Sequence, residues 1–142
     1  MEKLNKETER LMTERFSKDS IIALATTQDG VPYVRNVDAY YERGTFYVIT
    51  YALSNKMRQI GQNPTTAIAG EWFSGHGKGE NLGYFCKPEN AETAQKLKAA
   101  FSAWIDNGHN DFSDENTCIL AIRLTDGVLI AGGEYYAIDF TR

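Results

Sequence analysis

The chain has 142 residues, the size of one ordinary domain, and its 42% hydrophobic and 24% charged residues are typical of a folded protein rather than a disordered one. Fifteen basic and nineteen acidic residues give a net charge of −4, which argues against duplex nucleic acid or an anionic membrane as the main partner. The apolar runs are too short to span a bilayer, and the charged start of the chain lacks the apolar core of a signal peptide. We therefore expect one cytoplasmic domain over residues 1–142.

The first half of the chain predicts a helix followed by three antiparallel strands. Apolar residues recur at helical spacing through residues 2–18. Three strand-like segments follow, with tight turns between them, at residues 21–27, 31–41 and 45–50. Consecutive strands joined by short turns predict a meander.

The second half mixes short helices with further strands. A short helix over residues 54–60 begins at the N-cap Ser54 and stops before Asn63-Pro64. Pro88 opens a longer helix over residues 89–107, and a polar surface loop over 107–116 follows it. The remaining expected strands cover residues 65 to about 72, 78–85, 117–124, 128–131 and 134–140, with turns at Asp126-Gly127 and Gly132-Gly133.

About eight short strands with three helices predict a mainly β fold, a small antiparallel barrel with helices packed outside it. Side chains fill the interior of a barrel of this size. We therefore expect any ligand to bind on an outer face or at a contact between subunits.

Common catalytic motifs are missing from the sequence. Cys86 and Cys118 have no CxxC spacing, so reduced thiols are expected, with Cys118 as a small core residue. His76 and His109 lack metal-ligand spacing, so no metal site is predicted. The glycine-rich run at residues 75–80 has no GK[ST] ending and opens no helix, which favours a bend where backbones approach closely.

Two features point to an anion site. Ser54 and Lys56 begin a helix, where free backbone N–H groups and a positive partial charge suit a phosphate; a plain N-cap with a solvated lysine is the alternative. Arg35 shares an otherwise apolar strand face with Tyr33 and Val37, which is costly unless it meets an anion; an ion pair or a solvent-facing edge is the alternative. If strand and helix are adjacent, these groups converge on one dianion.

Several segments together resemble one known superfamily. They are residues 23–27, 30–35, 46–50, 54–56, 63–64 and 132–134. Their order is similar to the FMN-binding split-barrel superfamily of pyridoxamine 5′-phosphate oxidase and the general-stress-protein-26-like proteins. The resemblance covers nearly the whole chain and implies a split β-barrel that forms a homodimer, with FMN bound at the interface.

The resemblance also implies roles for individual residues. The FMN phosphate would be held by Arg35, Ser54 and Lys56. The flavin ring and ribityl chain would be lined by Asn36 and Val37, largely through backbone groups, and by Thr50 and Tyr51. Trp72 matches a position on a hairpin that the other subunit presents to the flavin; a core or dimer-contact aromatic is the alternative.

One departure argues against vitamin B6 oxidation. Where the true oxidase carries an Arg-x-His pair that grips its substrate, this chain has Tyr136 and Ile138. The resemblance then implies a small FMN-dependent oxidoreductase, reduced by a nicotinamide cofactor and passing electrons to a small electrophile or to oxygen. No catalytic residue is assigned, and Tyr51, Tyr135, Tyr136 and His76 are candidates only if they border the flavin.

Two alternatives stay open. One is a flavin-carrying stress protein without a dedicated substrate. The other is the same barrel with haem or the deazaflavin F420. Haem would need an axial histidine, for which only His76 and His109 are present. F420 has a long anionic tail, which favours a more basic groove than a chain of charge −4 suggests.

Overall fold

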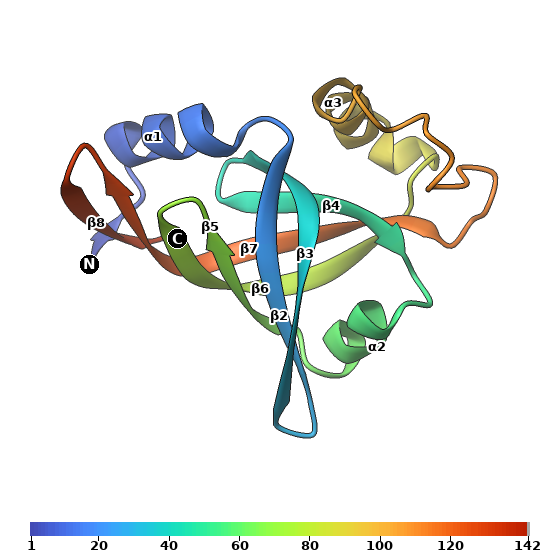
Figure 1. Cartoon of the computed structure of the whole chain (residues 1–142), viewed down its shortest axis with the longest axis horizontal. Helices are drawn as coiled ribbons and strands as arrows, with labels where there is room; N and C mark the ends of the chain where they lie inside the picture. The colour runs from blue at the N-terminus through green and yellow to red at the C-terminus, as the bar shows by residue number, and fades with distance from the viewer. Residues whose placement is uncertain (142) are drawn as a thin grey trace.

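The computed structural model describes residues 1–141 and shows a β-barrel with helices on its outside (Figure 1). In chain order its elements are β1 (Glu2–Lys3), α1 (Lys6–Phe16), β2 (Ser20–Gln28), β3 (Val31–Glu42), β4 (Thr45–Tyr51), α2 (Asn55–Gln62), β5 (Thr65–Gly70), β6 (Phe73–Tyr84), the 3₁₀ turn η1 (Pro88–Asn90), α3 (Ala91–Ala100), β7 (Thr117–Ala131) and β8 (Glu134–Asp139).

Six strands close the barrel. They pair in the order β7-β4-β3-β2-β5-β6, and β6 pairs again with β7. β8 continues the sheet from β7, and the two-residue β1 adds a parallel edge to β8. The pairings within the barrel are all antiparallel. The predicted mainly β fold with an antiparallel barrel is therefore confirmed.

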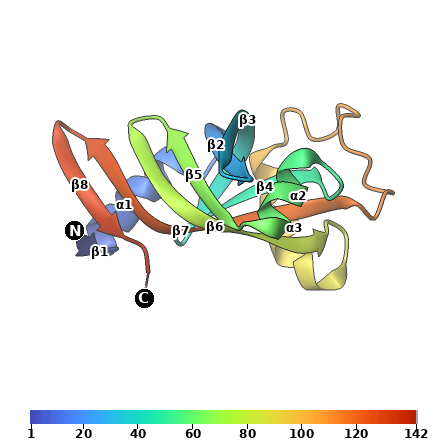
Figure 2. The ribbon, with the colours of Figure 1, turned by 90° about the horizontal axis from the view of Figure 1, so that it is seen from below.

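Apolar side chains fill the barrel and a second, smaller core. Phe16 of α1, Phe46 of β4 and Phe73 of β6 meet edge to face at one end of the barrel interior, with ring centroids 5.4 and 5.9 Å apart. Under α3, Leu97 and Phe101 pack into the second cluster. Seen from below, α1 and α3 lie at different ends of the barrel, and α2 lies beside β6 (Figure 2).

The barrel is split between β3 and β4. These strands pair only over three residues next to their connecting turn, from Tyr40–Tyr47 to Glu42–Thr45. Before Tyr40, β3 pairs only with β2, whereas β4 continues along β7 to Tyr51. The strand edges that face each other across the split therefore keep backbone groups without a ladder partner.

The β2–β3 hairpin extends beyond the barrel as an arm of residues 28–34 (Figure 1). Its tip is the predicted two-residue turn, where Asp29 and Gly30 both have positive φ, as the twist of antiparallel strands requires. β5 pairs with β2 only over residues 23–25, so no further strand of the described chain supports this arm.

Two predicted helices are shorter in the structure. The helix expected over residues 2–18 covers Lys6–Phe16, because Asn5 forms a capping box with Thr8 and the residues before it pair with β8. The helix expected over residues 89–107 is α3, after the turn η1, and residues 101–107 continue it only as turns.

The predicted breaks in the later strands were wrong. The glycine-rich run lies inside β6, and a Cβ on Gly77 would come within 2.9 Å of the Arg123 carbonyl oxygen, so glycine permits the close approach without a bend. The turn expected at Asp126-Gly127 is a register shift inside the continuous β7, where Gly77 pairs with Leu124 and His76 with Asp126. No helix within residues 1–141 is long and apolar enough to cross a membrane.

Candidate functional site

Arg35 lies halfway along β3 and reaches across β2 towards α2. Its guanidinium donates to the Leu24 carbonyl (3.2 Å), to the Thr26 hydroxyl (2.8 Å) and to Gln59 Oε1 (3.3 Å). All three acceptors are neutral, so they orient the side chain without balancing its charge. Burial lowers the pKa of Arg35 below its ordinary value. Its remaining N–H groups are free to meet an anion.

Lys56 stands in the first turn of α2 and is half-buried. Its ammonium donates to the hydroxyl of Thr50 at 2.6 Å, which ties the start of α2 to the end of β4. Burial lowers the pKa of Lys56, and the nearby charge of Arg35 lowers it further. The fold therefore brings Arg35 and Lys56 close enough for their charges to repel.

Ser54 is the N-cap residue of α2, as predicted, but its hydroxyl does not cap the helix. In the described chain its Oγ is buried and makes no hydrogen bond. A buried polar atom without a partner costs free energy, and such atoms are rare in folded proteins. Next to the free N–H groups of a helix start, an unbonded hydroxyl is suited to an anion.

We call Arg35, Thr50, Ser54 and Lys56 the cation cluster. Within residues 1–141 no carboxylate forms a salt bridge with either cation, whereas seven salt bridges form elsewhere. Burying two positive charges without a counterion is unfavourable. The cluster is therefore a site of uncompensated positive charge, with the geometry and donors to bind a phosphate group.

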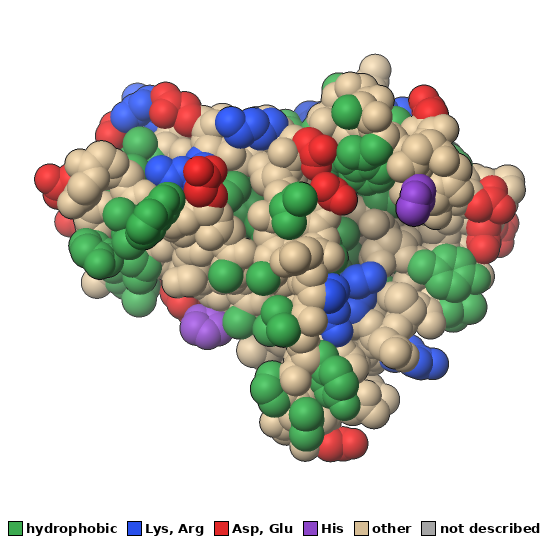
Figure 3. Space-filling model, viewed as in Figure 1, with side chains coloured by type: hydrophobic (Ala, Val, Ile, Leu, Met, Phe, Trp, Pro, Cys, Tyr) green, Lys and Arg blue, Asp and Glu red, His purple; other side chains and the backbone are tan. Residues whose placement is uncertain are grey.

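A cavity of about 330 Å³ opens into the split beside the cation cluster. Val37 and Asp38 of β3 form one wall, Val48 and Ile49 of β4 another, and Lys56 lies at its edge. The residues that follow α3 form the remaining wall: Trp104, Asn107, His109 and Asn110. Figure 3 shows this face, with basic side chains (blue) above the protruding arm and acidic ones (red) higher up.

Sequence reasoning missed the wall that follows α3. The polar composition of residues 107–116 correctly predicted a surface loop, but nothing local to them indicates what they face. Hydrogen bonds hold the loop in place: the Asn107 side chain accepts from the His109 backbone (2.9 Å), and Thr117 donates to the Asp111 carbonyl (2.6 Å). Two of the residues missed, Asp38 and Trp104, thus line the same cavity as Val37, Lys56 and His109, the last of which the sequence offered only as a haem ligand.

The other predicted site residues divide into two groups. Asn36 is exposed on the β3 side of the split, and Tyr51 ends β4 beside α2, so both lie close to the cation cluster. Trp72 lies away from the cation cluster. The six extended residues of β5 span about 20 Å, and Trp72 follows the end of that strand that is far from α2. Its side chain is 68% exposed and its φ is +52°, uncommon for a bulky residue.

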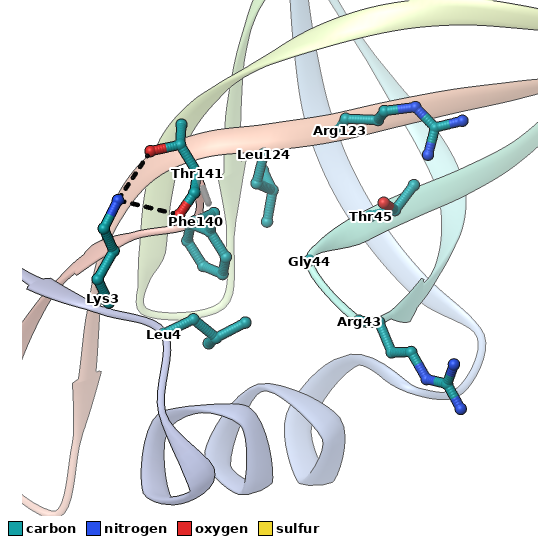
Figure 4. A pocket seen from close by; sticks show the side chains of 9 residues that line it. All are labelled: Lys3, Leu4, Arg43, Gly44, Thr45, Arg123, Leu124, Phe140 and Thr141. Carbon is teal, nitrogen blue, oxygen red and sulfur yellow. Dashed lines mark hydrogen bonds between the residues drawn. The ribbon is translucent and has the colours of Figure 1, made fainter.

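A larger cavity, of about 650 Å³, lies elsewhere, between the start of the chain, the β3–β4 turn and the end of β8 (Figure 4). Leu4, Leu124 and Phe140 point into its centre, while the guanidinium groups of Arg43 and Arg123 point away from it. None of the predicted site residues lines it.

The geometry defines a split-barrel protein, and comparisons with known proteins support that fold. No family model and no curated protein sequence matches the chain. General stress protein 26 from Bacillus anthracis superposes with a TM-score of 0.68 at 17% identity, over 91% of this chain and 97% of that one. A FAD-binding protein from Mesorhizobium loti gives a TM-score of 0.59 at 17% identity, over 87% and 92%.

A heme binding protein from Mycobacterium smegmatis gives a TM-score of 0.66 at 15% identity, over 87% of this chain and 54% of that one. A putative pyridoxamine 5′-phosphate oxidase from Listeria innocua is also among the structural neighbours. The expected split-barrel fold is thus confirmed, and the solved structures that share it include a FAD-binding protein and a heme binding protein.

Proposed function

We propose that this protein is an FMN-binding flavoprotein that holds the FMN phosphate in the cation cluster. One observation carries the proposal: two half-buried cations without a carboxylate lie beside a buried, unbonded serine hydroxyl at the start of a helix. A phosphate dianion would accept hydrogen bonds from Ser54 and both cations and would neutralise their charges. It would thereby remove two unfavourable features of the fold at once.

The split then receives the rest of the cofactor. Next to the cluster, the backbone of Asn36 and Val37 lies on the β3 edge that β4 leaves unpaired, so it offers hydrogen-bonding groups to a flat ring. Thr50 and Tyr51 stand at the end of β4 on the other side. Bound FMN would supply hydride chemistry, and these residues would orient it and limit its contact with water.

We further propose that the flavoprotein is an oxidoreductase, with a nicotinamide cofactor as electron donor and a small, unidentified acceptor. The cavity beside Val37 supports this, because it gives a second small molecule access to the split. A carrier without a substrate is the alternative. Anaerobic mixing with NADH or NADPH tests the choice: in an oxidoreductase one hydride from the nicotinamide reduces each FMN and the flavin absorbance is lost, whereas a carrier keeps it.

One observation supports the homodimer that we also propose. A two-stranded arm is marginally stable on its own, yet this arm exposes apolar side chains, among them Val31 (53%) and Val34 (70%). The role expected for Trp72 at the flavin would also require a second copy, because within one chain Trp72 lies away from the cation cluster. Sedimentation equilibrium tests the proposal: a dimer is expected, and Val34→Asp should shift it towards monomer.

The absorption spectrum of the purified protein tests the cofactor. We expect a flavin spectrum, heat-released FMN, and much weaker binding of riboflavin, which lacks the phosphate. A colourless protein that fails to bind added FMN would falsify the proposal. Haem is the second candidate, because His109 lines the same cavity and is free of a side-chain partner among the described residues. A Soret band that His109→Ala abolishes would favour haem.

A further inference from the structure

Two buried polar side chains, Thr26 of β2 and Gln59 of α2, hold the guanidinium of Arg35. The Thr26 hydroxyl donates to Gln59 Oε1, so its oxygen accepts from Arg35 Nη1 (2.8 Å). The same Gln59 Oε1 accepts from Arg35 Nη2 (3.3 Å). Both side chains are at most 5% exposed. The three groups therefore form a closed network of hydrogen bonds, and we call Thr26 and Gln59 the neutral clasp.

The orientation of the Gln59 amide is fixed from its other side as well. Its Nε2 donates to Gln28 Oε1 at 3.3 Å, at the base of the arm. A flipped amide would turn its N–H donors towards the donors of Arg35 and would leave the guanidinium without this acceptor. The carbonyl oxygen therefore faces Arg35, and it accepts a hydrogen bond without bringing a negative charge.

The neutral clasp determines which edge of Arg35 remains for a ligand. A guanidinium carries five N–H groups in one plane. Nη1 uses both of its hydrogens, on the Leu24 carbonyl (3.2 Å) and on Thr26, and Nη2 uses one on Gln59. Because the oxygens of Thr26 and Gln59 lie side by side, they occupy the edge between Nη1 and Nη2. In the described chain, Nε–H and the second Nη2 hydrogen make no hydrogen bond, and together they form the other edge with two donors.

We propose that Thr26 and Gln59 are positioning residues that present the Nε–Nη2 edge of Arg35 to a phosphate group and leave its charge uncompensated. Two parallel N–H donors match two oxygens of a phosphate, a bidentate contact that arginine makes and lysine does not. The neutral clasp thus favours a phosphate monoester over a neutral ligand. Its functional meaning rests on the proposed function, in which that monoester is FMN.

Gln59→Glu tests the neutral acceptor, because it keeps the shape of the side chain and adds the missing counterion. We expect FMN to bind at least about tenfold more weakly, whereas the affinity for riboflavin should change by less than about twofold. Gln62→Glu, the same change at the exposed last residue of α2, is the matched control and should leave FMN affinity within about twofold. Equal FMN affinities of the wild type and Gln59→Glu would overturn the proposal.

Gln59→Met separates positioning from folding. It removes the acceptor without adding charge, so it should lower the melting temperature of the ligand-free protein, yet weaken FMN less than Gln59→Glu does. Gln59→Glu should melt no lower than the wild type, because its carboxylate pairs with a half-buried cation. The two variants are therefore expected to rank in opposite orders for stability and for FMN affinity. A purely structural role would give the same order for both quantities, and that result would refute the proposal.

Arg35→Lys tests the edge itself and needs no change at Gln59. Lysine keeps the positive charge but has no planar pair of donors, so FMN should bind at least about tenfold more weakly. Wild-type affinity in this variant would contradict the proposal, because the charge alone would then be sufficient.

The two proposals can fail separately. If the wild type binds no FMN, the proposed function is wrong, and inorganic phosphate then tests the neutral clasp: it should raise the melting temperature of the wild type but not of Gln59→Glu. Equal rises in the two proteins would overturn the positioning role. If FMN binds tightly and equally to the wild type, Gln59→Glu and Arg35→Lys, the positioning role is wrong and the flavin site stands.

Discussion

The two ends of the barrel both carry basic residues, but these residues differ in their burial and in whether a carboxylate pairs with them. At the end near α1, Lys3 pairs with Asp139 at 2.8 Å and Arg123 pairs with Glu80 at 3.0 Å, and all four side chains are at least partly exposed. At the end near α2, Arg35 and Lys56 are half-buried and pair with no carboxylate of the described chain.

Under the proposed function, this difference separates charges with a structural role from charges that bind the ligand. An exposed ion pair contributes little to stability and is screened by salt, so it has no need of a ligand. A half-buried cation without a partner costs stability, which a fold tolerates where a ligand supplies the missing charge. Cavity size alone would have selected the wrong end, since the larger cavity lies next to the paired residues.

The largest expected effect is the loss of FMN when both cations of the cluster are removed. Arg35→Ala with Lys56→Ala should raise the dissociation constant for FMN by at least about 100-fold, because each charged hydrogen bond contributes about 1.5–3 kcal/mol. Riboflavin should lose far less. As the matched control, Arg43→Ala with Arg123→Ala should change FMN binding by less than about twofold, within the range of screened surface charges. If both double variants lost FMN affinity to a similar extent, the proposed difference between the two ends of the barrel would be wrong.

Removing only the lysine charge should change FMN binding and the stability of the ligand-free protein in opposite directions. Lys56→Met should weaken FMN yet stabilise the ligand-free protein by about 1 kcal/mol, because it removes a half-buried charge without a counterion. The folded-state pKa of Lys56 lies below 10.5, so its charge costs stability at neutral pH, and the cost disappears as pH rises from the lowered pKa to the unfolded value.

Thermal denaturation would check this prediction with and without inorganic phosphate. Phosphate should raise the melting temperature of the ligand-free wild type much more than that of Lys56→Met. Equal rises in both proteins would mean that phosphate acts elsewhere on the molecule.

A smaller effect is expected at Ser54. Ser54→Ala should weaken FMN binding by about tenfold or somewhat more, because one hydrogen bond to a charged group contributes about 1.5–3 kcal/mol. It should not destabilise the ligand-free protein, since the hydroxyl has no partner to lose. Equilibrium titration and a melting curve measure the two quantities. A clear loss of stability would indicate that Ser54 acts as an ordinary helix cap.

The smallest effect concerns the paired end. Hydrogen bonds from Lys3 and Thr141 hold the pKa of Asp139 at about 2, below its ordinary value of 3.8. A depressed folded-state pKa gives stability that is present above pH 3.8 and lost as pH falls towards 2. Asp139→Asn should flatten the acid limb of the stability curve slightly and leave FMN binding unchanged. A change in FMN affinity in Asp139→Asn would contradict this prediction, because it would show that the paired end influences the cation cluster.

Much of the fold follows from local patterns. Alternating apolar residues and tight turns such as Asp29-Gly30 predicted the first three strands to within one or two residues. The boundaries that failed depended on contacts far along the chain. Gly127 lies inside a strand because β6 and β8 pair with it from both sides, which its own neighbours do not encode.

By itself the sequence determined the class of the fold, the first three strands with the turns between them, and that Arg35, Ser54 and Lys56 would form an anion site if they met. Only the tertiary structure decided that Arg35 lies near Lys56, that β3 and β4 separate to form the split, and that Trp104 and Asp38 line the same cavity. The physical reason is that side-chain periodicity is a local property. Strand partners, unpaired edges and uncompensated charges exist only when segments distant in the chain are packed together.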